Sequence, residues 1–79
     1  EGIGRSAQGK LIRALYDGSP DVRAEAAHLL GDIGDEEAQR HLELLLTDGA
    51  RDAFGDRVGS IVRKALARLE RSRRYGPAA

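Results

Sequence analysis

The sequence predicts an all-α fold, an α-α superhelix of about four helices arranged as two repeats. Three observations support this prediction. Apolar residues recur with the period of a helix, capping residues and glycines separate the periodic segments, and one half of the chain is partly repeated in the other. No segment shows the apolar–polar alternation of a strand. A chain of 79 residues is long enough for one domain.

The first predicted helix covers residues 6–16. Four of its apolar side chains recur at helical spacing and share one face, and two more form a flanking stripe. Gly9 weakens this helix, and the sequence Asp-Gly-Ser-Pro at residues 17–20 breaks it. The first face consists of Ala7, Leu11, Ala14 and Leu15, and the flanking stripe of Ile12 and Tyr16.

The second predicted helix begins after Ser19, a favourable N-cap, with Pro20 in the first turn and Asp21 near the positive end of the helix dipole. Gly31 and Gly34 are predicted to end it, because glycine adopts left-handed backbone angles at low cost. The predicted buried stripe contains Val22, Ala26, Leu29, Leu30 and Ile33.

Asp35 is predicted to cap the third helix, with two glutamates in its first turn. Its predicted face is Ala38, Leu42, Leu45 and Leu46, with Leu44 to one side. The fourth helix, at residues 57–72, shows the strongest periodicity in the chain. Its predicted face is Val58, Ile61, Val62, Ala65, Leu66 and Leu69.

A polar, glycine-broken loop between the third and fourth helices contains a lone aromatic residue, Phe54. Such a residue either fills the core or is offered to a partner. A core of two repeats has few apolar side chains, so the sequence favours packing of Phe54 in the core.

The two halves of the chain match at two places. Leu-Tyr-Asp at 15–17 matches Leu-Thr-Asp at 46–48, and VRAEAAHL at 22–29 matches VRKALARL at 62–69. The second offset is longer, which predicts an inserted loop at 48–57. The predicted repeat domain spans 6–72, with repeats at about 6–34 and 35–72. Residues 1–5 are expected to be a disordered or artificial start, and 73–79 a flexible tail.

The run SPDVRAEAAHLLGDIGDEEAQRHLELLLTD resembles the HEAT-like repeat of the phycobilisome-lyase type. The matching features are a proline turn, Val-Arg, paired alanines, Leu-Gly, a Gly-Asp link and a leucine-rich helix. The resemblance implies a non-catalytic scaffold or protein-interaction module as the first expectation. It also implies an alternative, an accessory subunit of an enzyme such as a bilin lyase. Another protein is the expected partner.

The resemblance further implies that the second helix of each pair lines a concave surface. The expected partner-binding residues on these helices are Arg23, His28, Asp32, Arg63, Lys64 and Arg68. Arg23 and Arg63 hold equivalent places in the two repeats. For both, a structural tie to an aspartate or a backbone carbonyl of an adjacent turn is favoured over ligand binding.

Composition argues against catalysis, metal binding and a bound cofactor. The chain has no cysteine and two histidines, His28 and His41, which are not part of a metal-binding motif. Helix capping accounts for the acidic cluster of Asp32, Asp35 and the two glutamates that follow. No apolar run is long enough to span a membrane, so the protein is expected in the cytoplasm.

The net charge is zero, but residues 21–48 are mostly acidic and residues 51–79 mostly basic. This polarity is suited to steering a partner or joining copies head to tail. Nucleic-acid binding through the basic C-terminal helix is a second alternative, with Arg68, Arg71, Arg73, Arg74 and Tyr75, and is not favoured at zero net charge. Because repeat arrays usually need about three units, the domain is expected either to be part of a longer protein or to self-associate through an exposed apolar end such as Ile12, Tyr16 and Leu44.

Overall fold

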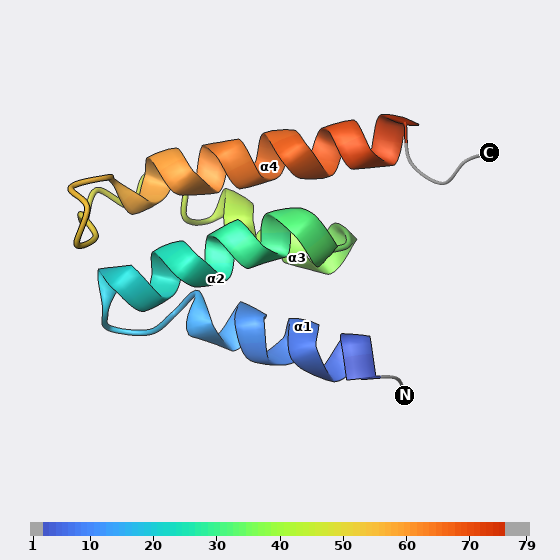
Figure 1. The fold of residues 1–79 in the computed structure, drawn as a ribbon, viewed down its shortest axis with the longest axis horizontal. Helices are drawn as coiled ribbons and strands as arrows, with labels where there is room; N and C mark the ends of the chain where they lie inside the picture. Colours follow the sequence, from blue (N-terminus) through green and yellow to red (C-terminus); the bar gives the residue numbers. More distant parts are fainter. Residues whose placement is uncertain (1–2, 76–79) are drawn as a thin grey trace.

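The computed structural model describes residues 3–75, and it describes side chains for residues 7–72. Figure 1 shows its four helices in order: α1 (Ile3–Ala14), α2 (Pro20–Ile33), α3 (Glu36–Glu43) and α4 (Val58–Tyr75). Over this range the chain forms no strand, and its one β-type contact is an isolated bridge between Arg51 and Arg57. The predicted all-α fold of four helices is therefore confirmed.

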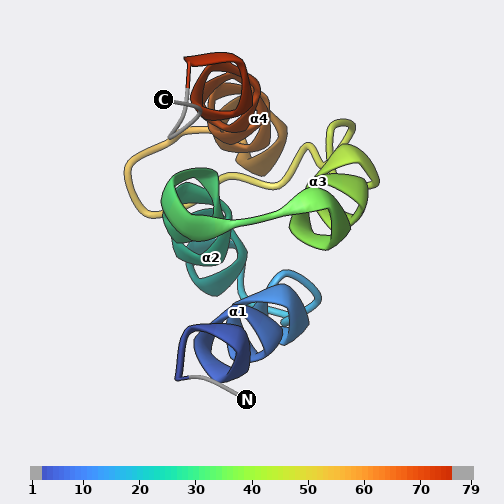
Figure 2. The ribbon, with the colours of Figure 1, turned by 90° about the vertical axis from the view of Figure 1, so that its right-hand side faces the viewer.

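The helices stack as two pairs, α1–α2 and α3–α4. Figure 2 shows α2 and α4 side by side in one layer, with α1 and α3 in the other. The middle of the stack is α2, which packs against α1 on one side and α4 on the other. Each pair thus buries its apolar face against the next, as in helical repeat arrays. Among the described residues, no helix is both long and apolar enough to cross a membrane.

The helix limits differ from the predicted ones at several ends. Helix α1 starts before residue 6, and α4 continues past residue 72 to Tyr75, so parts of both predicted terminal segments are helical. Residues 1–2 and 76–79 lie outside the described range. The first and third helices end early because the chain tightens into three-residue turns. The Tyr16 amide donates to the Arg13 carbonyl at 3.0 Å, and the Leu45 amide to the Leu42 carbonyl at 2.9 Å.

The predicted N-caps of α2 and α3 are confirmed. The Ser19 hydroxyl accepts a hydrogen bond from the Val22 amide. The Asp35 carboxylate accepts hydrogen bonds from the Glu37 amide at 2.9 Å and the Ala38 amide at 3.3 Å. These bonds satisfy amides that have no partner inside the helix.

The core lies between the two helix pairs and contains small as well as large side chains. Its buried apolar residues are Ile12, Leu15, Ala24, Ala26, Ala27, Leu30, Ala38, Leu42, Val58, Val62, Ala65 and Leu69. The predicted face of α4 is largely confirmed, with Ile61 and Leu66 partly buried at its edges.

The predicted buried stripe of α2 is wrong in three of its five members. Val22, Leu29 and Ile33 are exposed, and the last of them is 52% exposed. Helix α2 turns a different face toward α4, formed by Ala24, Ala27 and Leu30, because α4 lies close to it. The three exposed residues Val22, Leu29 and Ile33 lie on the outer side of α2 and face solvent. We call them the outer row.

The two glycines near the end of α2 serve close packing, which corrects the predicted left-handed termination. Gly31 is inside the helix, and a Cβ atom there would lie 2.9 Å from both Cα and Cβ of Ala65. Gly34 caps the helix with φ −72°, and a Cβ there would lie 2.8 Å from Cβ of Ala38. A side chain would therefore collide with α4 at Gly31, and at Gly34 with both the Leu30 carbonyl of α2 and Ala38 of α3.

Three further predictions about burial are corrected. Phe54 does not fill the core, since it is 89% exposed. Leu46 was expected on the buried face of the third helix and is exposed, because the chain has already left the helix there. Ile12 was expected at an apolar end available for self-association, but it belongs to the buried core, whereas Tyr16 and Leu44 are exposed.

Candidate functional site

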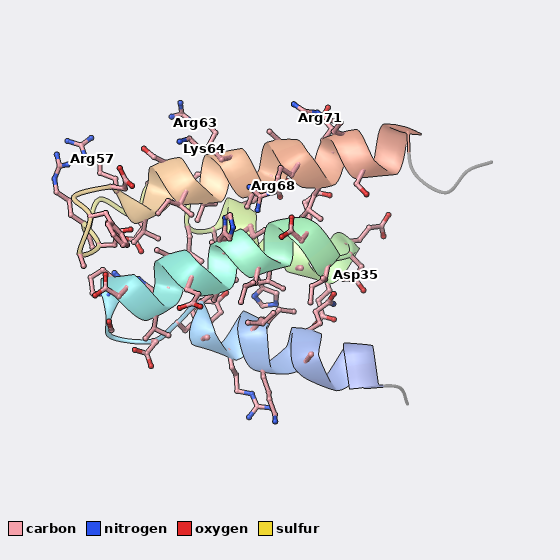
Figure 3. All side chains as sticks on the ribbon, viewed as in Figure 1. Asp35, Arg57, Arg63, Lys64, Arg68 and Arg71 are labelled. Atoms are coloured by element: carbon pink, nitrogen blue, oxygen red, sulfur yellow. The ribbon has the colours of Figure 1, made fainter. Side chains whose placement is uncertain are left out.

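A cleft of about 710 Å³ opens between α2, α4 and the loop that joins α3 to α4. We call it the α2–α4 cleft. Figure 3 shows Arg68 between α4 and α2. The lining residues are Asp21, Ala24, Glu25 and His28 from α2, Asp52, Ala53, Phe54 and Asp56 from the loop, and Ile61, Lys64 and Arg68 from α4.

The loop holds Phe54 in a defined position at the rim of the cleft. One Asp52 carboxylate oxygen, Oδ1, accepts hydrogen bonds from the amides of Phe54 and Asp56, each at 2.9 Å. The Arg51 guanidinium donates to the Gly55 carbonyl at 2.7 Å, and Gly55 adopts φ 87°, which favours glycine. Several hydrogen bonds therefore fix the backbone on both sides of Phe54, although its ring is exposed.

The loop is also attached to α2. The Ala53 amide donates to the Asp21 carboxylate at 2.5 Å. This bond joins the insertion of the second repeat to the first turn of α2 in the first repeat. The position of Phe54 relative to the cleft therefore depends on both repeats.

Arg68 crosses the floor of the cleft from α4 to α2. Its Nε donates to Asp32 Oδ1 at 3.2 Å, and its Nη2 donates to the His28 carbonyl at 2.6 Å. The same Nη2 lies 3.5 Å from Nδ1 of the His28 ring. Three of the expected partner-binding residues are thus gathered at one place, where they contact one another.

The cleft is acidic. Four carboxylates line it, against the two cations Lys64 and Arg68, and one of these cations is already paired with Asp32. Lys64 is exposed and is one of the residues that line the cleft. Such a surface attracts a segment that carries positive charge. The four carboxylates belong to Asp21, Glu25, Asp52 and Asp56.

Three of the six expected partner-binding residues, Asp32, Arg23 and Arg63, do not line the cleft. The Arg23 side chain is only 15% exposed, and its Nε donates to Asp48 Oδ2 at 2.9 Å. Its Nη1 also donates to the Asp17 carbonyl at 2.7 Å. Arg23 therefore ties the first repeat to the second, as the favoured interpretation expected. Arg63 is exposed and points away from α2 (Figure 3), and no described residue forms an ion pair with it.

The other polar residues singled out in the sequence serve the fold. His41 Nδ1 lies 2.7 Å from the Tyr16 hydroxyl, and the two rings meet edge to face at 5.7 Å between centroids. For Asp35, desolvation raises the carboxyl pKa, but hydrogen bonds from the Ala38 amide, the Gln8 side chain and the Glu37 amide outweigh it and lower the pKa below its ordinary value. Within the described part of the chain, no three acidic, histidine or cysteine side chains are grouped to hold a metal ion.

The basic cluster at the end of α4 is only partly visible. Arg68 is engaged with Asp32 and His28, as described above, and Arg71 is exposed. The side chains of Arg73, Arg74 and Tyr75 lie outside the described residues. The described part of this cluster therefore offers one unengaged arginine toward a phosphate backbone.

A family model for HEAT repeats matches residues 2–69, which is most of the chain. The chain belongs to the HEAT-repeat family. This HEAT-repeat protein matches no curated protein and no solved structure. Membership agrees with the geometry, since HEAT repeats are helix pairs that stack in two layers and generally mediate protein–protein interaction.

The sequence signals for the cleft were weaker than those for the helices. Its acidic lining comes from residues dispersed over α2 and the loop, and only folding brings them together. The exposure of Phe54 had one local signal, since Asp52 two residues earlier favours a turn in which its carboxylate holds the following amides.

Proposed function

We propose that this HEAT-repeat protein is a non-catalytic protein-interaction module whose contact surface is the α2–α4 cleft with Phe54 at its rim. The observation that carries the proposal is the exposed Phe54 ring on a loop fixed by hydrogen bonds to Asp52. A large aromatic side chain held in place before binding loses little entropy when a partner covers it.

The chemistry of the cleft defines the partner segment further. Phe54 requires an apolar pocket or side chain on the partner, and the four carboxylates favour a segment with lysine or arginine. Lys64 and the exposed edge of His28 supply additional polar contacts. Arg23 is excluded from this surface by its ion pair with Asp48, and Arg63 by its direction.

Site-specific crosslinking tests this proposal. A photoreactive phenylalanine analogue replaces Phe54 in one protein and Leu44 in a control, because Leu44 is 70% exposed and does not line the cleft. Irradiation in an extract of the native cells is expected to crosslink a discrete protein from position 54 alone. The crosslinked protein is then purified and its affinity measured.

The expected result is a loss of affinity of about tenfold or more for Phe54→Ala, as for a hot-spot aromatic. Lys64→Glu should alter binding to a smaller extent, and Leu44→Ala and Arg63→Glu should leave it unchanged. Identical crosslinks from positions 54 and 44, or a partner whose affinity ignores both cleft variants, would contradict the proposal.

The phycobilisome-lyase subtype is a narrower form of the same proposal. It is supported by the motif SPDVRAEAAHLLGDIGD, and it makes the partner an enzyme that attaches or removes a bilin. Fold-level likeness carries little information about such a role. Mixing the protein with a free bilin and recording the visible spectrum tests direct pigment binding, and an unchanged spectrum would leave the general interaction role in place.

A further inference from the structure

The two ends of the stack have different surfaces. At the α1–α2 end, the outer row of Val22, Leu29 and Ile33 is apolar and exposed. At the α4 end, Figure 3 shows Arg63 and Arg71 pointing away from α2, on the side that no other helix covers in Figures 1 and 2. The outer row, Arg63 and Arg71 do not line the α2–α4 cleft, although Glu25, which is used below, does. The inference concerns self-association and does not rest on the proposed function.

The contact between the two repeats shows what such surfaces bind. At this contact Arg23 of the first repeat reaches Asp48 of the second, and Gly31 packs on Ala65. The internal repeat relates Val22 to Val62 and Leu29 to Leu69, and these two residues of the second repeat are buried against the first. The outer row therefore occupies the positions that a preceding repeat would cover.

The same equivalence identifies an exposed acceptor for an arginine. Asp17 corresponds to Asp48, and each carboxylate accepts a hydrogen bond from the amide two residues later, Ser19 at 2.9 Å and Ala50 at 3.0 Å. The Asp48 carboxylate also accepts from Arg23, whereas the Asp17 carboxylate is exposed and accepts from no arginine side chain of the described residues, since Arg23 reaches only the Asp17 backbone carbonyl. Asp17 is thus the first-repeat counterpart of an aspartate that binds an arginine of the adjacent repeat.

We propose that a second copy of this chain stacks on the α1–α2 end, with the exposed end of its α4 against the outer row. In this arrangement the contacts between the two repeats, Arg23 with Asp48 and Gly31 with Ala65, recur between the two copies. Arg63 of one copy then meets Asp17 of the other, because Arg63 corresponds to Arg23 and Asp17 to Asp48. The arrangement also places Arg71, which corresponds to Gly31, opposite Glu25, which corresponds to Ala65. Both pairs join opposite charges.

Apolar side chains lie between these two charge pairs. The exposed Leu46, which corresponds to the buried Leu15, and the exposed Ala67 lie on the α4 end of the stack. In the proposed arrangement they cover Val22 and Leu29 of the next copy. The interface is head to tail, so it uses two different surfaces and can extend to further copies.

Sedimentation velocity of the 79-residue chain, from micromolar to millimolar concentration, tests the stacking. The expected result is association that grows with concentration and weakens as salt screens the two charge pairs. Leu29→Glu should abolish it, because a carboxylate enters the apolar centre. Leu44→Glu is the matched control, since Leu44 is exposed but lies outside the interface.

A charge exchange identifies the surfaces that meet. Arg63→Asp and Asp17→Arg each place like charges together, and each should weaken self-association by about tenfold or more. Mixing the two variants restores opposite charges at every contact and should restore association. A monomer at all concentrations, or association that Leu29→Glu abolishes while the mixture behaves like each variant alone, would overturn the head-to-tail arrangement.

Discussion

The two repeats carry different chemistry at equivalent positions of their second helices. In α2, Ala24, Leu30 and Gly31 are buried against the neighbouring repeat. The corresponding positions of α4 carry Lys64, Glu70 and Arg71, which are exposed. One motif has thus been adapted to two places in a stack: small and apolar where a neighbour lies close, charged where the stack ends.

The inserted loop is a second difference between the repeats. In the first repeat a short turn at residues 15–19 joins the two helices, whereas in the second a longer loop reaches back to Asp21 of α2. The insertion therefore adds a contact surface without disturbing the stack. The following predictions test how far the two repeats differ, from the largest expected effect to the smallest.

The largest difference is expected for the equivalent leucines Leu69 and Leu29. Leu69 is 4% exposed and Leu29 40% exposed. Leu69→Ala should lower the free energy of unfolding by about 2–5 kcal/mol, because it leaves a cavity in the core. Leu29→Ala should cost roughly 1 kcal/mol. Urea denaturation at low protein concentration measures both, and equal losses would refute the difference in burial between the repeats.

The equivalent arginines come next. Arg23→Ala removes the charged hydrogen bonds to Asp48 and the Asp17 carbonyl, and should lower the free energy of unfolding by about 2 kcal/mol. Arg63→Ala should change it by less than about 0.5 kcal/mol, as for an exposed residue. The same denaturation experiment applies, and a large loss for Arg63→Ala would show an intramolecular role for that residue.

Two helical glycines offer a test with opposite signs. Gly31→Ala should destabilise the protein by about 1 kcal/mol, because its Cβ would meet Ala65 and overpacking outweighs the gain in helix propensity. Gly9→Ala should stabilise the protein by about 0.5–1 kcal/mol, since no atom lies near its Cβ position. Thermal unfolding of both variants shows the two signs, and a stabilised Gly31→Ala would contradict the close approach of α2 and α4.

The smallest difference is expected between the two N-caps, Ser19 and Asp35, which should behave alike at neutral pH. Replacing either by alanine should cost about 1 kcal/mol at neutral pH. They differ in acid: because the Asp35 pKa is lowered on folding, its contribution is complete above the ordinary carboxyl pKa and is lost as pH falls through the lowered value.

Asp35→Asn keeps a good cap but cannot titrate, so its stability should decline less below about pH 4 than that of the unchanged protein. Ser19→Ala should decline in parallel with the unchanged protein. Unfolding free energies measured between neutral and acidic pH provide the comparison, and parallel curves for all three proteins would show that Asp35 does not couple to protons.

The sequence predicted the features that depend on neighbours along the chain. The caps at Ser19 and Asp35, the stripe of α4 and the tie made by Arg23 all have local signals. The buried face of α2 was predicted incorrectly, because apolar or small residues occur around most of that helix. Periodicity alone then does not give the direction in which α4 lies.

By itself, the sequence determined four helices, their order, their caps and the internal repeat that pairs them, because each follows from short-range backbone and side-chain preferences. Tertiary structure decided which α2 residues are buried, that Gly31 makes room for Ala65, and that Phe54 is exposed beside an acidic cleft. The physical reason is that burial depends on which helix lies opposite, and residues from both repeats must come together before an inner face and an outer face exist.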